Sequence, residues 1–243
     1  MAATAPSFAG SFPDMSFDKV FEFSHLTPFV KSHLRNVYLT LTGALALATV
    51  GVLADIKFHL GGTISFLATL FGVMWLNATP PTKTNQASRT GVLGAVAFAQ
   101  GCSAGPLMDA VIDINPMIIA YAMAATSAVF LCFSLAALVA KRRSYLYLGG
   151  ILSSAVTVLM MVRMMSMFGM GMPFSLELYL GLGIFMAYVV FDTQVIVEKA
   201  SRGDADHVVH ALGLFQDFIA IFIRLVIILT KKEQDKEQKR RRR

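Results

Sequence analysis

Long apolar segments separated by short polar stretches fill most of the chain after residue 36. A helix needs about 20 apolar residues to cross the hydrocarbon core of a bilayer, and each segment is long enough for one crossing. The pattern predicts an all-α polytopic membrane protein without room for a folded soluble domain. The seven segments are residues 37–56, 60–79, 90–109, 116–140, 146–168, 175–197 and 211–229.

Polar ends flank this region. We expect residues 1–36 to form a cytosolic tail with a short amphipathic helix near 28–36, and residues 230–243 to form a basic cytosolic tail. The seven-segment domain between them is then residues 37–229. Within it, Gly101 and Gly105 have the spacing of small residues that lets helices pack closely, and Pro106 predicts a kink or an end of its helix.

Composition agrees with a membrane protein. Hydrophobic residues make up 56% of the chain and charged residues 15%, too few charges to cover a soluble domain of this size. The net charge of +6 does not indicate nucleic acid, because eight of the 21 Lys and Arg residues lie in 231–243 and most others flank apolar segments. The expected partner is the lipid bilayer.

The basic residues also predict topology. Ten of them lie in the N-terminal tail and the loops on its side of the membrane, against only Lys57 in the opposite loops, so we expect a cytosolic N-terminus. Seven full crossings would then carry the basic C-terminal tail to the far side. The last segment holds both Asp217 and Arg224, which favours a place surrounded by protein. We therefore predict six transmembrane helices around a central seventh helix or re-entrant segment.

Ionisable residues inside the membrane are costly, and each is a candidate functional residue. Arg163 can extend its side chain to the interface, and Glu177 begins a helix, where an acid is favourable. We interpret Arg163 as structural and keep Glu177 and Arg224 as supporting charges. The full set of candidates is Arg89, Arg163, Glu177, Asp192, Asp217 and Arg224.

The two aspartates lie at matching depth. Asp192 comes six residues before the polar loop that starts at Glu198, and Asp217 seven residues after His210, where that loop ends. At 1.5 Å per residue both carboxyls are expected about 9–10 Å below the cytosolic boundary. Consecutive helices are usually neighbours, so we expect the pair to meet.

Two carboxyls in a medium of low dielectric do not easily ionise together, which predicts a shared proton and a proton-sensitive gate or transient calcium site at Asp192 and Asp217. Arg89 begins its segment on the same side and is expected to reach the pair as a latch that a proton or cation can break. The alternative is a polar cluster that only holds helices together.

Several motifs resemble the Bax inhibitor-1 family, the transmembrane Bax-inhibitor-motif proteins, and most closely its eukaryotic endoplasmic-reticulum branch. The resemblance runs from about Arg35 to the tail. The matching stretches are Val37-Tyr-Leu-Thr-Leu41, Gly105-Pro106, Arg142-Arg143-Ser-Tyr-Leu-Tyr-Leu-Gly-Gly150, Tyr188-Val-Val-Phe-Asp-Thr-Gln194 and Leu214-Phe-Gln-Asp-Phe-Ile-Ala-Ile-Phe-Ile-Arg224.

The resemblance implies a suppressor of cell death in the endoplasmic-reticulum membrane that lets calcium leak in a pH-dependent way. The family's paired aspartates match Asp192 and Asp217, and its latch arginine matches Arg89. It links the basic tail to pH sensing and to partners, for which we expect Bcl-family proteins, stress sensors and calmodulin. Some relatives carry Glu where this chain has Gln100, which removes one negative charge from an expected cation path. No cofactor is expected, with calcium as the transported ion and protons as the regulator.

Three other functions compete with a calcium leak. An intramembrane aspartyl protease also places one Asp on each of two helices, but its Tyr-Asp and Gly-x-Gly-Asp motifs are replaced here by Phe191-Asp192 and Leu214-Phe-Gln-Asp217, so we expect no enzyme. A proton/calcium antiporter and a non-conducting adaptor that binds partners through the cytosolic tail remain open.

Overall fold

The structure is a computed structural model that describes residues 27–82, 84–140, 147–169 and 173–242. Most of the expected N-terminal tail (residues 1–26) and the basic residues Lys83, Lys141, Arg142, Arg143 and Arg243 lie outside the described residues. The described residues form helices and no strands. The helices are α2 (Pro28–Phe58), α3 (Thr63–Ala78), α4 (Gln86–Ile114), α5 (Met117–Val139), α6 (Leu148–Met167), α7 (Phe174–Ser201) and α8 (His207–Arg241).

Six of these helices are long and apolar enough to cross a membrane, and α3, with 16 residues, is the shorter one. This confirms the predicted all-α polytopic fold. Several helices extend beyond the apolar segments that predicted them. Residues 28–36 are the first turns of α2, whose N-cap residue Thr27 accepts a hydrogen bond from the Val30 amide at 3.4 Å, and α8 remains helical through most of the basic tail.

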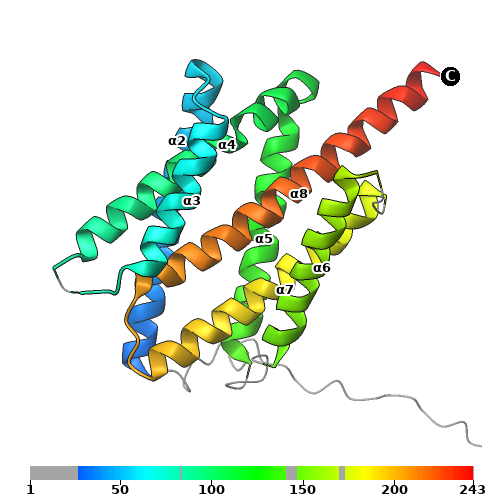
Figure 1. The fold of residues 1–243 in the computed structure, drawn as a ribbon. Coiled ribbons are helices and arrows are strands. Elements are labelled where there is room, and N and C mark those ends of the chain that lie inside the picture. Colours follow the sequence, from blue (N-terminus) through cyan, green and yellow to red (C-terminus); the bar gives the residue numbers. More distant parts are fainter. Residues whose placement is uncertain (1–26, 83, 141–146, 170–172, 243) are drawn as a thin grey trace, which may run out of the picture.

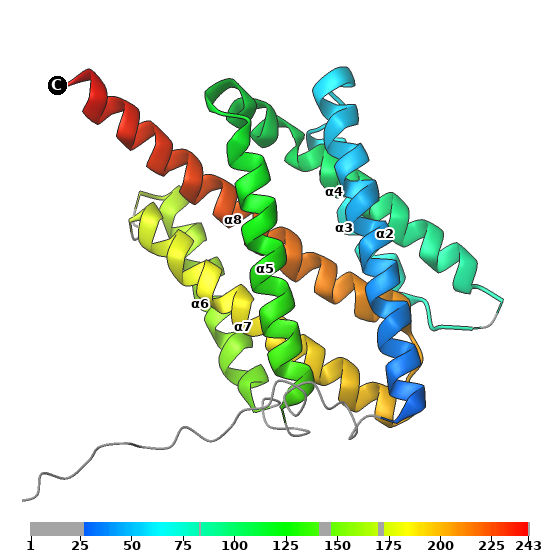
Figure 2. The same cartoon turned by 180° about the vertical axis from the view of Figure 1, so that it is seen from behind.

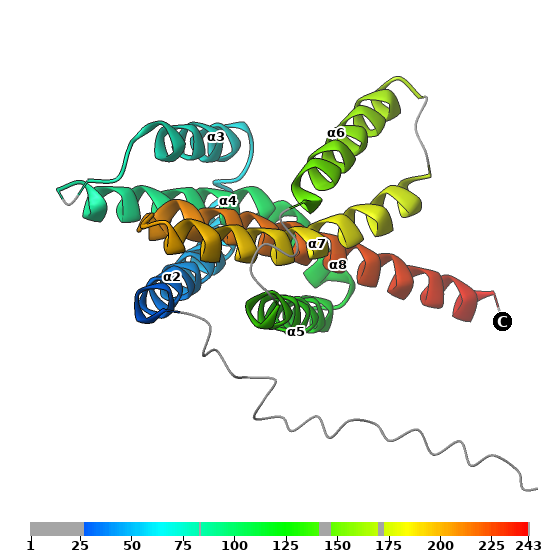
Figure 3. The ribbon, with the colours of Figure 1, turned by 90° about the horizontal axis from the view of Figure 1, so that it is seen from below.

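The helices form three layers (Figure 3). Helices α2 and α5 lie on one side, α4, α8 and α7 in the middle, and α3 and α6 on the other side. Helix α8 packs against α7, α2, α5 and α4. It is also one uninterrupted helix of 35 residues, so of the two predicted alternatives the structure contains a central seventh helix and not a re-entrant segment.

Close contact between backbones holds α2 against α4. A Cβ at Gly101 would lie 2.0 Å from the Ala48 carbonyl oxygen, and one at Gly51 would lie 2.2 Å from the Phe98 carbonyl oxygen. Only glycine fits at both positions, as expected where helices pack through small residues. Pro106 does not end α4, which continues to Ile114.

The helices alternate in direction, so the two ends of the bundle are distinct (Figures 1 and 2). Helix α2 begins at the end where α7 turns into α8, and α8 finishes toward the opposite end, which also carries the α2–α3 and α4–α5 connections. The site residues discussed below are therefore ordered along α8, starting from the α7–α8 turn.

Candidate functional site: an aspartate pair and an ion pair on the central helix

The structure brings Asp192 of α7 and Asp217 of α8 together, close enough for their carboxyl groups to share a hydrogen bond when one of them is protonated. Asp192 lies nine residues before the end of α7 at Ser201, and Asp217 lies ten residues after the start of α8 at His207. At 1.5 Å per residue both are about 14–15 Å from the turn. The two acids therefore lie at similar distances from the α7–α8 turn, and these distances exceed the expected value of about 9–10 Å because both helices extend past the apolar segments. Their depth in the membrane stays a prediction.

Asp217 is buried, with 4% of its surface exposed, and its Oδ2 has no hydrogen-bond partner within the described residues. Gly213, one turn earlier on α8, brings the α8 backbone close to Asp192, since a Cβ at this position would lie 3.2 Å from Asp192 Oδ2. The absence of a side chain at Gly213 therefore helps the two carboxyls to approach. Tyr188, one turn before Asp192, lies near enough to interact electrostatically with both acids.

A hydrogen bond between two carboxyl groups needs one proton, because carboxylate oxygens only accept. The pair therefore carries at most one negative charge while the bond exists, and a second ionisation would place two like charges in contact in a buried site. The arrangement can respond to protons, and also to a cation that replaces the shared proton.

Arg89 does not contact the aspartate pair. Its Nη1 and Nη2 donate to Asp206 Oδ1 and Oδ2 at 2.9 and 2.7 Å, and Nη2 also donates to the Leu76 carbonyl oxygen at 3.3 Å. Asp206 is the N-cap residue of α8 and lies 11 residues before Asp217, about 16 Å along the axis. Our expectation that Arg89 contacts the aspartate pair is therefore wrong for this arrangement.

The physical reason lies in the register of α4. Arg89 occupies the first turn of that helix, at the level of the α7–α8 turn, where Asp206 is the nearest acid. The guanidinium is 1% exposed and receives a bidentate partner that compensates for the loss of water. Sequence reasoning missed Asp206 because we treated residues 198–210 only as a polar loop. Its position as an acid just before an apolar helix was the available signal.

Another buried polar contact lies at the same end of the bundle. His33 of α2 and His210 of α8 are each about 5% exposed, and His33 Nε2 lies 2.9 Å from His210 Nδ1. Asp204 Oδ2 is 3.8 Å from His210 Nε2. Neither histidine is among the candidate residues predicted from the sequence. In the structure they join the start of α2 to the start of α8.

The supporting charges lie toward the opposite end. Arg224 packs over the Phe185 ring with Cζ 4.4 Å from the centroid, and its Nη1 donates to the Ala220 carbonyl oxygen at 2.9 Å. Glu177 lies 4.0 Å from Arg163 and interacts electrostatically with Arg224. These contacts do not bring Glu177 or Arg224 to the aspartate pair.

Gln100 has a specific partner in Gln216, the residue before Asp217. Each side-chain amide donates to the other's oxygen at 3.1 Å, which joins α4 to α8 through a reciprocal pair of hydrogen bonds. The amide that stands where some relatives were expected to carry Glu is thus held by the residue that precedes Asp217, and it brings no charge. Its effect on ion passage stays a prediction.

Calcium usually takes six to eight oxygen ligands. No group of three or more His, Cys, Asp or Glu residues suited to hold a metal ion is found in the described parts of the chain. Two carboxyl groups can contact a passing cation, which would have to keep most of its water.

These features define a polytopic helical membrane protein with two neighbouring carboxyl groups on its central helices. Residues 30–234 match the family described as "Inhibitor of apoptosis-promoting Bax1". The chain is 42% identical over 224 residues to Bax inhibitor 1 of Arabidopsis thaliana, covering 91% of this chain and 90% of that one. It is 39% identical over 230 residues to Bax inhibitor 1 of Homo sapiens, covering 93% and 97%.

Bax inhibitor 1 of Oryza sativa subsp. japonica is 38% identical over 242 residues, which are 99% of this chain and 96% of that protein. The protein therefore belongs to the Bax inhibitor-1 family, as the sequence motifs indicated. It is a multi-pass membrane protein of an apoptosis-inhibitor family.

Proposed function

We propose that this protein suppresses programmed cell death in the endoplasmic-reticulum membrane by acting as a pH-sensitive calcium leak channel, with Asp192 and Asp217 as its gate. The protein contributes no catalytic chemistry in this proposal. Membership of the family supports the role in cell death. The close approach of the half-buried Asp192 to the buried Asp217 supports the gate, and it is the observation that carries the mechanism.

The gate follows from the chemistry of the pair. While Asp192 and Asp217 share a proton, the hydrogen bond between them ties α7 to α8. Loss of that proton leaves two carboxylates that repel, and a hydrated calcium ion between them relieves the repulsion. Asp217 Oδ2 is buried and has no hydrogen-bond partner among the described residues, so it would offer such an ion an oxygen once the pair separates.

Arg89 takes a modified place in this mechanism. As a latch on the aspartates it would have to leave Asp206 and shift by about 16 Å relative to α8. In the present arrangement it fixes the start of α8 to α4 instead. We therefore assign it the role of positioning the helix that carries Asp217.

The termini form a separate part of the proposal. We place the N-terminus in the cytosol and propose that the basic tail binds Bcl-family proteins, stress sensors or calmodulin. A cytosolic tail conflicts with seven complete crossings, because α8 begins and ends at opposite ends of the bundle. Protease protection of an epitope after Arg243 decides this point, since cleavage in sealed microsomes requires a cytosolic tail.

Calcium efflux from vesicles that contain the purified full-length protein tests the proposed channel. Asp217→Asn should change the rate and weaken its pH dependence. The matched control is Asp235→Asn, an exposed acid near the far end of the same helix, which should behave as the unmodified protein. Equal behaviour of the Asp217 variant and the unmodified protein would show that the pair is not the gate.

The same vesicles separate the alternatives. Stoichiometric proton movement against calcium would identify an antiporter, whereas a leak moves calcium without it. An adaptor would show no flux, and cells expressing the Asp192→Asn, Asp217→Asn double variant would remain protected from death.

A further inference from the structure

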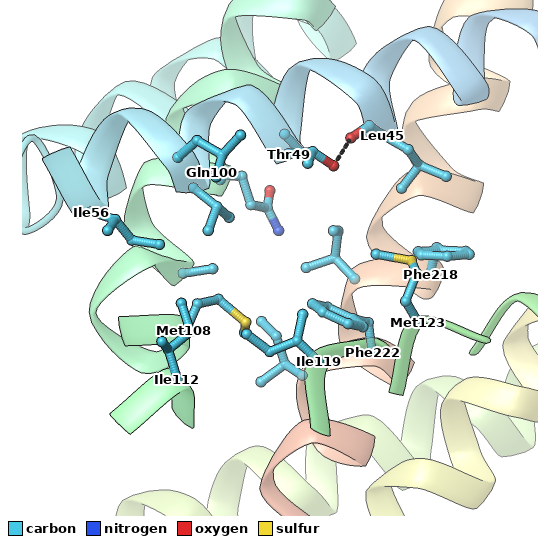
Figure 4. A pocket seen from close by; sticks show the side chains of 17 residues that line it. Leu45, Thr49, Ile56, Gln100, Met108, Ile112, Ile119, Met123, Phe218 and Phe222 are labelled. Carbon is cyan, nitrogen blue, oxygen red and sulfur yellow. Dashed lines mark hydrogen bonds between the residues drawn. The ribbon is translucent and has the colours of Figure 1, made fainter. Parts of the chain in front are cut away.

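A cavity of about 180 Å³ lies beside the central helix, between α2, α4, α5 and α8. Figure 4 shows side chains from these helices pointing into it. Most are aliphatic, aromatic or methionine side chains, among them Ile56, Ile119 and Phe222. Thr49 uses its hydroxyl on the Leu45 carbonyl oxygen at 2.9 Å, and Gln100 is paired with Gln216. The walls therefore offer little to water.

The cavity lies behind an opening between two helices. Helices α2 and α5 both pack against α4 and α8, yet within the described chain they are not packed against each other (Figure 3). Residues at this opening, such as Thr49, Leu53 and Met123, are exposed, with Leu53 62% and Met123 37% exposed. In a membrane protein this opening faces hydrocarbon, so lipid chains surround it at very high concentration.

We propose that this cavity is a binding slot for one acyl chain of a membrane lipid. Its size decides against a protein helix, whose diameter with side chains is about 10–12 Å. Water is disfavoured, because apolar cavities of about 150 Å³ stay dry and accept hydrocarbon ligands. An acyl chain matches both the volume and the chemistry of the walls.

The height of the slot agrees with this occupant. Leu45 and Ile56 line its two ends on α2 and are 11 residues apart, about 16 Å along the helix. One leaflet contributes about half of the roughly 30 Å hydrocarbon core. The slot thus spans one leaflet, the one at the end of the bundle with the α2–α3 and α4–α5 connections.

The charged residues at the rim of the slot indicate which lipid headgroup it accepts. Lys57 follows the last lining residue of α2, while Asp109 and Asp113 lie on the exposed surface of α4 near Ile112. Charges of both signs give no preference for an anionic lipid. The slot therefore recognises the hydrocarbon chain, and a zwitterionic phospholipid satisfies it.

Photocrosslinking in vesicles tests this assignment. The full-length protein is reconstituted in phosphatidylcholine that contains a small share of a phosphatidylcholine with a diazirine in mid-chain, then illuminated and mapped by peptide mass spectrometry. Adducts are expected on Phe218 and Phe222, which are only 4% and 7% exposed. Adducts on the exposed Phe71 serve as the reference for lipid contact. Labelling confined to exposed residues such as Phe71 would overturn the proposal.

Blocking the slot gives the second arm. Thr49→Phe places a ring at the opening and should lower labelling of Phe222 relative to Phe71 about tenfold, the effect of losing the burial of one to two methylenes. Val50→Phe is the matched control, because Val50 is 52% exposed and does not line the cavity. Ile119→Trp fills the slot from α5 and repeats the test. Equal labelling in all three variants contradicts the assignment.

A hydrated cavity is the remaining outcome. Thr49→Cys in a Cys102→Ala, Cys132→Ala background would then react quickly with a water-soluble, membrane-impermeant thiol reagent. The acyl-chain slot predicts a rate no faster than that of Val50→Cys. Fast reaction of the Thr49→Cys variant but not of the Val50→Cys variant would show that water and not lipid occupies the cavity, which would overturn the proposal.

Discussion

The start and the middle of α8 each carry an acidic residue, but the two acids have partners of different charge. At the start, Asp206 meets the guanidinium of Arg89 with two hydrogen bonds of 2.9 and 2.7 Å. Eleven residues later, Asp217 meets another acid, Asp192, and one of its oxygens has no partner among the described residues. Asp206 and Asp217 are both buried, whereas Asp192 is half-buried, so water can compensate for little of the hydration that Asp206 and Asp217 lose.

This difference gives the two pairs different properties: one can anchor a helix, and the other can respond to protons. A buried pair of opposite charges with bidentate geometry is stable over a wide pH range and is disrupted only by removal of a partner. A pair of like groups depends on one shared proton, so its bonding changes whenever that proton leaves. Arg89–Asp206 therefore anchors the start of α8, whereas Asp192–Asp217 has the chemistry that the proposed gate requires.

The largest effect is expected from breaking the anchor. Arg89→Met leaves a buried Asp206 carboxylate unpaired and should lower the free energy of unfolding by about 3–5 kcal/mol. Arg35→Met, at an exposed position of α2, should change it by less than about 1 kcal/mol. Thermal unfolding in detergent measures both.

The double variant Arg89→Met, Asp206→Leu sharpens the same comparison. It replaces the buried ion pair with apolar side chains and should recover most of the lost stability. A double variant as unstable as Arg89→Met would mean that Asp206 is not the group left unpaired.

A smaller loss is expected at the amide pair beside Asp217. Gln216→Leu removes both hydrogen bonds to Gln100 and leaves a half-buried amide without its partner, which should cost about 1–3 kcal/mol. Adding Gln100→Leu removes the stranded amide, so the double variant should be the more stable one. Additive losses in thermal unfolding would show that the two amides act independently.

The smallest change in stability tests the approach of the two acids. Gly213→Ala gains about 0.5–1 kcal/mol of helix propensity but places a Cβ 3.2 Å from Asp192 Oδ2, so the net change in unfolding free energy should be near zero. The expected effect is a shifted pH dependence of calcium efflux. Gly183→Ala on α7, where a Cβ meets nothing within 4 Å, should leave that profile unchanged. If neither variant alters the pH profile of calcium efflux, Gly213 does not control how closely Asp192 and Asp217 approach.

Much of the fold was predictable because hydrophobic segments of sufficient length specify membrane helices directly. The ends of the helices were less predictable. Helix α8 ends at Arg241 instead of residue 229, and α2 begins at Pro28 instead of residue 37. Hydropathy marks only the part of a helix that lies in hydrocarbon, whereas caps such as Thr27 and polar helix formers extend the helix further.

The site was predictable to a similar extent. Matching distances from one loop were enough to pair Asp192 with Asp217, because consecutive helices share the same end of the bundle. The partner of Arg89 was not predictable in the same way. It depends on how the α7–α8 turn folds back over α4, which is a property of tertiary packing and of the N-cap at Asp206.

The most direct test of the central claim is the pH profile of calcium efflux from vesicles that contain the Asp192→Asn, Asp217→Asn double variant. Asparagine keeps the size and hydrogen bonding of the pair but has no proton to lose. The account predicts a rate that stays constant from acid to mildly alkaline buffer, while the unmodified protein changes its rate over the same range. A double variant that retains the pH dependence of the unmodified protein would contradict the account.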